Sequence, residues 1–444
     1  MPCLHYDLAH HFPISVTMAN YPNSYYAATL NSKLETNPLP QNLEVETCII
    51  GGGYAGLMTA LSLIERGHTN VAVIEKHKVG YGCSGRNGGF VFGGYSLGPR
   101  KLIKQVGEAK AKELYDLTIE GVNLIRERVK KYNIDCDLVD EGVLWANWFK
   151  DQSLLLDEQA FMRDKMGTEW QYIEPEALRE QLKTDRYHGA LFEPNAMHFH
   201  PLNYARGIAK QIQSQGGQVF EDCAVTDIDY KSATKIIKTV NGNIKAKNVV
   251  LSGGGYIGDL CKPVANSILP IATYVMTTEP LGDDLQNYIN TQAAVYDTRF
   301  AFDYYRPLKD TRILWGGRIN ANTKKPKDLD HILRHDLAKV FPELKDVKVD
   351  YNWQGWMGYA RHQMAQIGEL APNVWYGIGF GGHGVAPTTT AGEILAAAIT
   401  KQNDTYKNFQ PWGLPWNGGP FGPIAAQMSY WWYELKDWMK EKTE

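Results

Sequence analysis

Four glycines within six positions, Gly51 to Gly56, have the spacing that most directly indicates a chemistry. Three of them, Gly51, Gly53 and Gly56, stand in G-x-G-x-x-G register between two apolar runs. These glycines allow a tight turn, close approach of a pyrophosphate to the backbone, and close packing of a helix on a strand. The free N–H groups at the start of the helix then suit phosphate. The spacing therefore predicts a dinucleotide site, with Tyr54 and Ala55 in the phosphate turn.

An acidic residue, Glu75, lies 24 residues after Gly51. A carboxylate there can accept hydrogen bonds from ribose hydroxyls, and it repels a 2′-phosphate, which argues against NADP. To position these groups, the apolar patterns predict a strand over 45–50, a helix over 57–66 and a strand over 71–74. Strand, glycine turn, helix, strand and carboxylate in this order favour dinucleotide binding over a glycine-rich turn in an unrelated α/β unit.

A second glycine-rich segment, VGYGCSGRNGGFVFGGYS, covers residues 79–96, and its polar residues include Ser84, Arg86 and Asn87. A nicotinamide-binding domain would continue here with a third strand–helix unit. A loop of this length is uncommon without a function, although it can also be a surface connector. We interpret it as a loop that lies beside the phosphate turn and follows an extended cofactor toward its reactive ring.

With these motifs in place, the chain resembles the glycine oxidase and D-amino acid oxidase family of FAD-dependent amine oxidoreductases. The matching text begins with IIGGGYAGL, VIEK and GYGCSGRNGG. Within the family, the match is best to the branch that acts on gamma-glutamylputrescine, and it runs from about residue 24 to the C-terminus. Further matching segments are SYYAA at 24–28, IDCD at 134–137, HPLN at 200–203, DYYR at 303–306 and GHGV at 382–385.

The resemblance implies an α/β fold of two domains (α+β in arrangement). A Rossmann-like FAD-binding domain is joined to a substrate-binding domain built on an antiparallel sheet. The expected limits are an N-terminal extension over 1–44, a discontinuous FAD-binding domain over 45–134, 200–270 and 355–400, a substrate-binding domain over 135–199 and 271–354, and a C-terminal extension over 401–444.

The C-terminal extension contains an amphipathic helix that carries Trp431, Trp432, Leu435 and Trp438. An amphipathic helix commonly buries its apolar stripe, so we expect this one to dock on its own protein. Contact with a membrane surface or a respiratory partner is the alternative.

The resemblance also implies the residues that contact FAD. These are Gly51, Gly53, Tyr54, Ala55, Gly56, Glu75, Lys76, Ser84, Arg86, Asn87, Gly88, Val225, Gly254, Gly381, Gly382, His383 and Gly384. The last four precede an Ala-rich helix within 374–399, whose N-terminus would stabilise negative charge on the reduced flavin. Some relatives attach the flavin through a cysteine shortly before this turn. No cysteine follows Cys261, so we expect non-covalent FAD.

The implied chemistry removes a hydride equivalent from the carbon next to an amine nitrogen, and the cofactor carries the difficult electronics. The imine then hydrolyses to an aldehyde, and oxygen reoxidises the flavin to give hydrogen peroxide. Two alternatives remain: a dehydrogenase that passes electrons to a quinone or a protein, and a flavin-binding redox sensor without turnover.

Substrate contacts are expected from an aromatic segment over 300–310. Tyr304 and Tyr305 are candidates for catalysis and for substrate binding, although strand alternation can send only one of them to the cavity. Arg306 either pairs with a substrate carboxylate or covers a surface. Gln363 is a candidate for substrate binding, and it stands where the matched branch tends to carry arginine. This difference leaves the identity of the substrate open. His383 is either catalytic or holds the glycine turn by hydrogen bonds.

Composition narrows the class of protein. The formal net charge is −3 and no dense basic block occurs, which argues against a nucleic-acid partner. The six cysteines are scattered without a C-x-x-C pair, so we expect reduced thiols, no metal site and a cytoplasmic location. No apolar run approaches the length of a membrane span, and the N-terminus lacks a signal-peptide pattern. The expected partners are a small amine and oxygen; the oligomeric state is open, an oligomer included.

Overall fold

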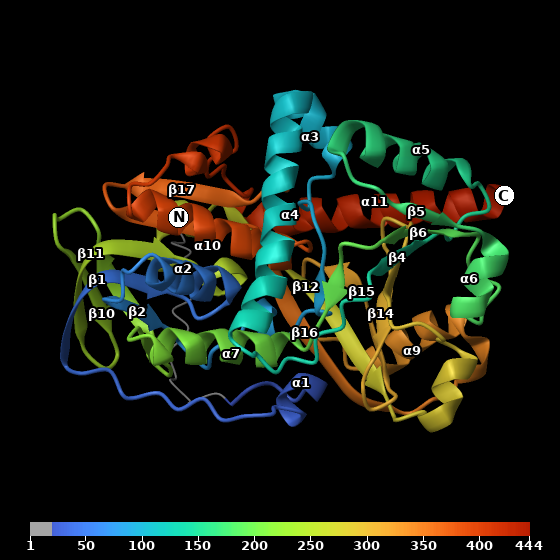
Figure 1. Ribbon diagram of the computed structural model, residues 1–444, viewed down its shortest axis with the longest axis horizontal. Coiled ribbons are helices and arrows are strands. Elements are labelled where there is room, and N and C mark those ends of the chain that lie inside the picture. Colours follow the sequence, from blue (N-terminus) through green and yellow to red (C-terminus); the bar gives the residue numbers. More distant parts are fainter. Residues whose placement is uncertain (1–19) are drawn as a thin grey trace, which may run out of the picture.

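Two eight-stranded β-sheets lie side by side in the computed structural model, which describes residues 20–444 (Figure 1). The first sheet has its core strands in the order β17-β18-β11-β1-β2-β8, and β10 and β9 continue it from β11. The second has the order β16-β12-β15-β14-β13-β4-β6-β5. This is the α/β fold of two parts that the sequence predicts.

The first sheet is parallel at its centre, where β1 pairs with β11 and β2. The predicted strands over 45–50 and 71–74 are present, and β1 begins earlier, at Asn42. Its strands are β1 (Asn42–Ile50), β2 (Val71–Ile74), β8 (Gln218–Phe220), β9 (Val225–Asp229), β10 (Lys235–Thr239), β11 (Asn243–Leu251), β17 (Gln366–Ala371) and β18 (Val374–Ile378).

Helices cover one face of the first sheet (Figure 1). The helices that contact the sheet are α2 (Tyr54–Glu65), α7 (Pro201–Ser214) and α10 (Val385–Ile399). Outside them, α4 (Glu108–Lys131) packs on α10, and α3 (Pro99–Val106) packs on α4. The helix predicted over 57–66 starts three residues earlier because Gly53 is its N-cap. This start places the first turn of α2 directly at the predicted phosphate turn.

The second sheet is antiparallel at every pairing except one, since β4 and β13 run parallel. Its strands are β4 (Val143–Ala146), β5 (Gln171–Ile173), β6 (Ala190–Glu193), β12 (Ile268–Thr278), β13 (Ala294–Asp297), β14 (Tyr304–Pro307), β15 (Ile313–Asn320) and β16 (Val349–Ala360). Helices α5 (Ser153–Phe161), α6 (Pro175–Gln181) and α9 (Leu329–Val340) accompany this sheet, and α8 (Lys262–Ala265) precedes it. A separate two-stranded ribbon joins β3 (Phe90–Val91) to β7 (Met197–His198).

Two long strands pass through the predicted domain limits. Strand β12 crosses the limit at 270/271, and β16 crosses the limit at 354/355. These two strands pair with each other along eleven residues of β12, from Ile268 to Thr278. The division into domains therefore remains a proposal, with this pair of strands shared between them.

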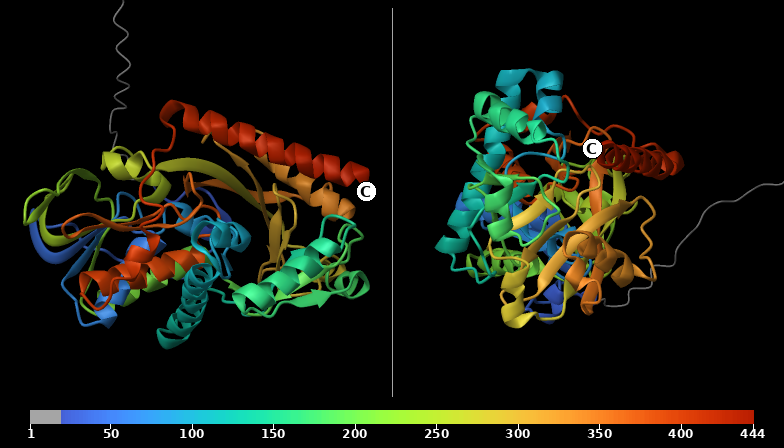
Figure 2. Two further views of the ribbon diagram at one scale, coloured as in Figure 1. Left: turned by 90° about the horizontal axis from the view of Figure 1, so that it is seen from above. Right: turned by 90° about the vertical axis from the view of Figure 1, so that its right-hand side faces the viewer.

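The C-terminal helix α11 (Gly422–Thr443) lies along the outside of the second sheet (Figure 2). Its contacts with the body include Tyr430, which is buried, Tyr433, which stacks on Phe300, and Asp437, which accepts hydrogen bonds from the Phe300 and Ala301 amides. The expectation that the helix docks through its tryptophan-rich stripe was wrong, because its other side contacts the protein. Exposed instead are Trp431, Trp432, Leu435 and Trp438.

Residues 20–444 contain no helix that is both long and apolar enough to cross a membrane. The same residues bring no three His, Cys, Asp or Glu side chains together as a metal site. Cys48, Cys83, Cys136, Cys223 and Cys261 are free thiols, and Cys3 lies outside the described residues. Helix α1 (Tyr25–Ala28), in the matching SYYAA segment, buries Tyr26 against Trp353.

Candidate active site

One continuous cavity of about 2710 Å³ extends from the β1–α2 turn to the second sheet. Ordinary small-molecule sites occupy roughly 300–1,000 Å³, so this cavity has room for a large cofactor and a substrate together. We call one part the dinucleotide end, lined by Gly51, Gly53, Glu75, Val225 and Gly254. The other part is the aromatic end, lined by Phe92, Tyr115, Trp145, Trp170 and Tyr296.

The glycines of the β1–α2 turn have the steric roles that their spacing predicts. Gly51 has φ +117°, a conformation that residues with a Cβ rarely adopt. A Cβ on Gly56 would lie 2.0 Å from the Gly51 carbonyl oxygen, so only glycine allows this approach of helix to strand. The Tyr54 amide donates to Ser84 Oγ at 2.9 Å, which ties the helix start to the second glycine-rich loop.

Glu75 closes the dinucleotide end at the carboxyl end of β2. Its Oε2 accepts a hydrogen bond from the Gly52 amide at 2.8 Å, and its Oε1 accepts one from the His77 amide at 2.9 Å. Burial raises the pKa of this carboxyl, although the two amides partly offset the effect. A carboxylate has about four acceptor positions, so Glu75 keeps positions free for ribose hydroxyls.

Replacing Glu75 by alanine is expected to weaken FAD retention without changing the flavin spectrum. The change removes the acceptor for ribose and leaves the Gly52 amide unpaired, a loss of about 1–3 kcal/mol, or roughly 5- to 150-fold in affinity. Flavin fluorescence during titration of the apoprotein with FAD measures this affinity. Glu46→Ala, on the neighbouring strand β1 with its side chain 42% exposed, serves as the control. Equal affinity of Glu75→Ala and wild type would refute the ribose role.

The loop over 79–96 supplies a polar wall between the two ends. Arg86 donates from Nε to the Tyr81 carbonyl at 2.7 Å and from Nη1 to the Gln354 carbonyl at 3.2 Å. Its Nη2 is buried and has no partner among residues 20–444. Asn87 donates to the Cys83 and Ser84 carbonyls, which fixes the loop. A buried donor without a partner, facing a cavity, fits a cofactor that brings acceptor oxygens, as FAD does.

The other residues predicted to contact FAD all line this cavity. These lining residues are Tyr54, Ala55, Lys76, Ser84, Asn87, Gly88, Gly381, Gly382, His383 and Gly384. Gly56 is the exception, because it lies behind the turn. Their direct contact with FAD stays a prediction. The first turn of α10 also lines the cavity, and the stabilisation of negative charge on a reduced flavin by its free N–H groups stays a prediction.

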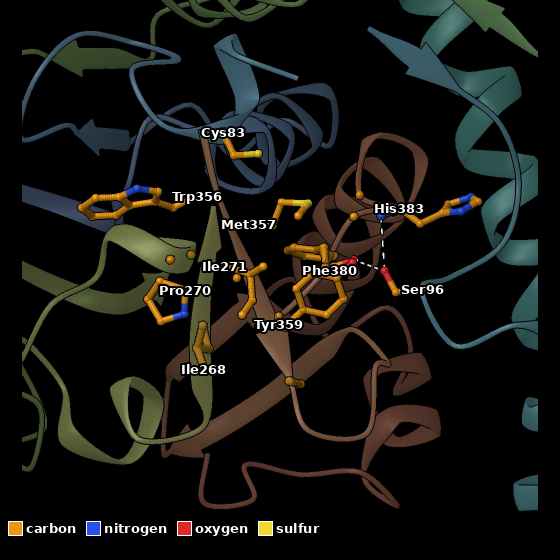
Figure 3. A pocket seen from close by; sticks show the side chains of 18 of the residues that line it. Cys83, Ser96, Ile268, Pro270, Ile271, Trp356, Met357, Tyr359, Phe380 and His383 are labelled. Carbon is orange, nitrogen blue, oxygen red and sulfur yellow. Dashed lines mark hydrogen bonds between the residues drawn. The ribbon is translucent and has the colours of Figure 1, made fainter. Parts of the chain in front are cut away.

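His383 holds the glycine turn before α10. Its ring Nε2 lies 2.7 Å from the Gly93 carbonyl oxygen, and its amide donates to Ser96 Oγ, which in turn donates to the Phe380 carbonyl. Figure 3 shows the ring pointing away from Met357 and Tyr359. Burial lowers the ring's pKa to about 4, so the ring is neutral at pH 7 and its proton is held by Gly93. This geometry favours the turn-holding role over the catalytic one.

Strand β14 sends its two tyrosines to opposite sides. Tyr304 lines the cavity and lies against Gly88, where an added Cβ would come within 2.5 Å of the ring. Tyr305 is fully buried and stacks on Trp315 with ring centroids 4.8 Å apart. The expectation that Tyr305 contacts substrate was therefore wrong, because the alternation of the strand places it in the core of the second sheet.

Arg306 is a structural residue. Its guanidinium is buried and donates to the Gly88 carbonyl at 2.8 Å and the Phe199 carbonyl at 2.9 Å. It does not line the cavity, so the expected pairing with a substrate carboxylate was wrong. Gln363 does line the cavity, and its role in substrate binding stays a prediction.

Phenylalanine substitutions at the two tyrosines form a matched test. Tyr305→Phe is expected to leave kcat/KM unchanged, since its hydroxyl has no hydrogen-bond partner among the described residues and lies outside the cavity. Tyr304→Phe removes a hydroxyl from the cavity wall, and we expect kcat/KM to change by roughly 2- to 12-fold, as for one hydrogen bond. Steady-state amine oxidation by both variants checks this. The reverse order of effects would contradict the assignment.

The sequence reasoning missed the residues of the aromatic end. Glu193 is the outstanding one: its carboxyl lies in the cavity wall and is only 4% exposed. A signal existed, since Glu193 ends the apolar run ALF before Pro194, and a carboxylate on a buried strand is unusual. The surrounding aromatic residues gave no such signal, because aromatic side chains are ordinary core residues.

The fold and the cavity together fit a flavin-dependent oxidoreductase. A family model described as FAD dependent oxidoreductase (DAO) matches residues 46–398, and the chain belongs to this family. The chain is thus an FAD-dependent enzyme of the class that acts on CH–NH donors, as the resemblance implies.

Individual relatives narrow the comparison. The chain is 36% identical to gamma-glutamylputrescine oxidoreductase of Escherichia coli (strain K12), over 95% of this chain and 99% of that protein. It is 33% identical to the probable oxidoreductase OrdL of Haemophilus influenzae, over 93% and 97%. Among solved structures, glycine oxidase from Geobacillus kaustophilus has a TM-score of 0.72 at 19% identity, covering 84% of this chain and 99% of that one. The last likeness confirms the glycine oxidase type of fold.

Proposed function

We propose that the protein oxidises gamma-glutamylputrescine, or a closely related gamma-glutamylated or N-substituted amine, with oxygen as the electron acceptor. The observation that carries this proposal is the single cavity that joins the dinucleotide end to the aromatic end. The substrate class is supported by 36% identity to gamma-glutamylputrescine oxidoreductase across nearly the whole of both chains.

FAD bound in this cavity supplies the acceptor for a hydride equivalent from the carbon next to the amine nitrogen. The residues of the chain bind and orient the two molecules. Gly51 and Gly53 form the phosphate turn, and Glu75 accepts hydrogen bonds from the ribose hydroxyls. The aromatic end excludes water from the bound amine, which loses its proton before the hydride leaves. After oxidation, the imine hydrolyses to an aldehyde.

Product analysis tests the substrate and the acceptor. The purified enzyme is offered gamma-glutamylputrescine, putrescine, spermidine, sarcosine and D-alanine in air, with hydrogen peroxide and aldehyde measured separately. We expect both products from gamma-glutamylputrescine in equal amounts. Aldehyde formation only with an added quinone or dye acceptor would identify a dehydrogenase. No aldehyde from any of these amines under either condition would overturn the proposed function.

We also propose that FAD is bound without a covalent link. The thiol of Cys83 lies in the cavity wall (Figure 3), but burial raises its pKa to about 11, which makes it a poor nucleophile at pH 7. Acid precipitation is expected to release the flavin completely into the supernatant. A yellow pellet would indicate a covalent link. The free thiols also support a reducing, cytoplasmic setting.

A further inference from the structure

A buried carboxyl group without an ionic partner faces the aromatic end of the cavity. Glu193, the last residue of β6, is 4% exposed, and its Oε1 has no hydrogen-bond partner among residues 20–444. In the same residues no lysine, arginine or histidine forms a salt bridge with it. A buried polar group in a folded protein normally has a partner, so this one indicates a ligand that supplies it.

The surroundings of Glu193 determine which ligand fits. Tyr115 from α4 and Tyr296 from β13 lie near enough for the charge of Glu193 to raise the pKa of both hydroxyls, after the larger effect of burial. Tyr296 stacks on Phe92, with ring centroids 5.5 Å apart, and on Trp145, with ring centroids 6.3 Å apart. Trp170 packs edge-on against Trp145. A carboxylate within a wall of aromatic rings suits a cation, which is attracted both by the charge and by ring faces.

We propose that Glu193 and the aromatic residues around it form the subsite that binds a protonated amino group of the substrate. This inference rests on the proposed function and deepens it, since it makes the substrate a cationic amine. Glu193 supplies the negative charge, and the rings of Trp145, Trp170 and Tyr296 exclude water from the pair. Molecules without a protonated amino group lack this pairing and bind more weakly.

The protonation of Glu193 gives the subsite a dependence on pH. Burial raises the pKa of this carboxyl to about 8, and the Gly93 amide offsets only part of the effect. Below this pH the empty subsite is neutral, so a cation must displace a proton. Affinity for a cation should therefore rise with pH up to about 8 and then level off. The other titratable groups near the subsite are Tyr115, Tyr296, His383 behind Gly93, and Glu158, which pairs with Arg100. Both tyrosines titrate well above this range, and His383 well below it.

Choline and its neutral isostere 3,3-dimethyl-1-butanol test the subsite without turnover. Choline cannot be oxidised to an imine, because its nitrogen has no lone pair. It also has no titratable group near pH 8. Isothermal titration calorimetry of the FAD-loaded enzyme at pH 8.5 is expected to show choline binding at least about tenfold tighter than the alcohol, the scale of one desolvated cation–ring and charge contact. Equal affinities in wild type would overturn the inference.

Two variants complete the test. Glu193→Gln keeps the shape of the side chain and should abolish the preference for choline, whereas Glu158→Gln, a carboxylate already paired with Arg100, should keep it. A Glu193→Gln protein that retains the preference would overturn the inference. If that variant fails to fold, wild type alone decides, because choline affinity that does not change between pH 6 and 8.5 contradicts the role of Glu193. An enzyme that binds choline as expected but oxidises no gamma-glutamylated amine would refute the proposed function and leave the subsite standing.

Discussion

Gly53→Val is expected to yield a protein that purifies without FAD. Gly53 is the N-cap of α2, and a Cβ at this position already lies 3.0 Å from Ser84 Oγ. The two methyl groups of valine would occupy the space in front of the helix start, where the backbone must approach the pyrophosphate. We expect FAD content below about a tenth of the wild-type value, which corresponds to a loss of more than ~1.4 kcal/mol in binding free energy. Absorbance at the flavin band, relative to protein, measures it.

The control for this variant is Gly98→Val, the same substitution at the N-cap of α3. Gly98 has φ −58° and nothing within 4 Å of an added Cβ, so the variant should retain FAD. A Gly53→Val protein that purifies as yellow as wild type would show that the turn does not hold the pyrophosphate. Loss of FAD from both variants would point to unfolding, which circular dichroism detects.

Among the substitutions considered, Arg128→Met should cause the largest loss in the free energy of unfolding. Arg128 is 1% exposed and lies between two helices of the FAD-binding region. Its Nη2 donates to Glu65 on α2 at 2.5 Å and to Glu393 on α10 at 2.6 Å. Removing the guanidinium leaves both carboxylates partly buried, and a broken buried pair costs about 3–5 kcal/mol. The expected value is about 3 kcal/mol, because Arg66 still pairs with Glu393 and Tyr132 with Glu65.

Thermal unfolding with excess FAD measures the effect, and Arg126→Met is its control. Arg126 lies on the same helix and pairs with Asp140 at the surface, where a pair contributes about 0–1 kcal/mol. Burial raises the carboxyl pKa of Glu65 and of Glu393, but Arg128 and the other donors around the two carboxyls together outweigh burial, and the net shift is downward. Carboxyls with a lowered pKa stabilise the fold above the unfolded pKa, about 4.5, and lose this contribution as the pH falls through the folded pKa. The difference between wild type and Arg128→Met should therefore shrink below about pH 4.5. A constant difference would contradict the ionic role.

The cofactor half of the fold could be predicted because its signals are local. Gly51, Gly53, Gly56 and Glu75 stand at fixed spacings along one strand–helix–strand unit, and each has a steric or hydrogen-bonding role that glycine or a carboxylate alone fills. The docking face of α11 could not be predicted, since its stripe of tryptophans is compatible with either face. The body contacts Tyr430 and Asp437 instead, through partners far away in sequence.

The substrate half of the site depends on tertiary placement. Sequence predicts that one of Tyr304 and Tyr305 faces the cavity, but the direction depends on the pairing of β14 with β15, where Tyr305 lies opposite Trp315. In the sequence Arg306 resembles a ligand-binding residue. In the structure its guanidinium donates to the Gly88 and Phe199 carbonyls. The carboxylate of Glu193 at the end of an apolar run is visible in the sequence, but its aromatic surroundings come from α4, β4 and β13 and appear only in the structure.

Anaerobic titration of the bound flavin tests the central claim most directly. Flavin absorbance is followed while gamma-glutamylputrescine, putrescine, spermidine, sarcosine or D-alanine is added without oxygen, and air is then admitted. The account predicts that gamma-glutamylputrescine bleaches the flavin at the lowest concentration and that air restores the absorbance. Bleaching by D-alanine or sarcosine in preference to gamma-glutamylputrescine, or no bleaching by any of the five amines, would contradict it.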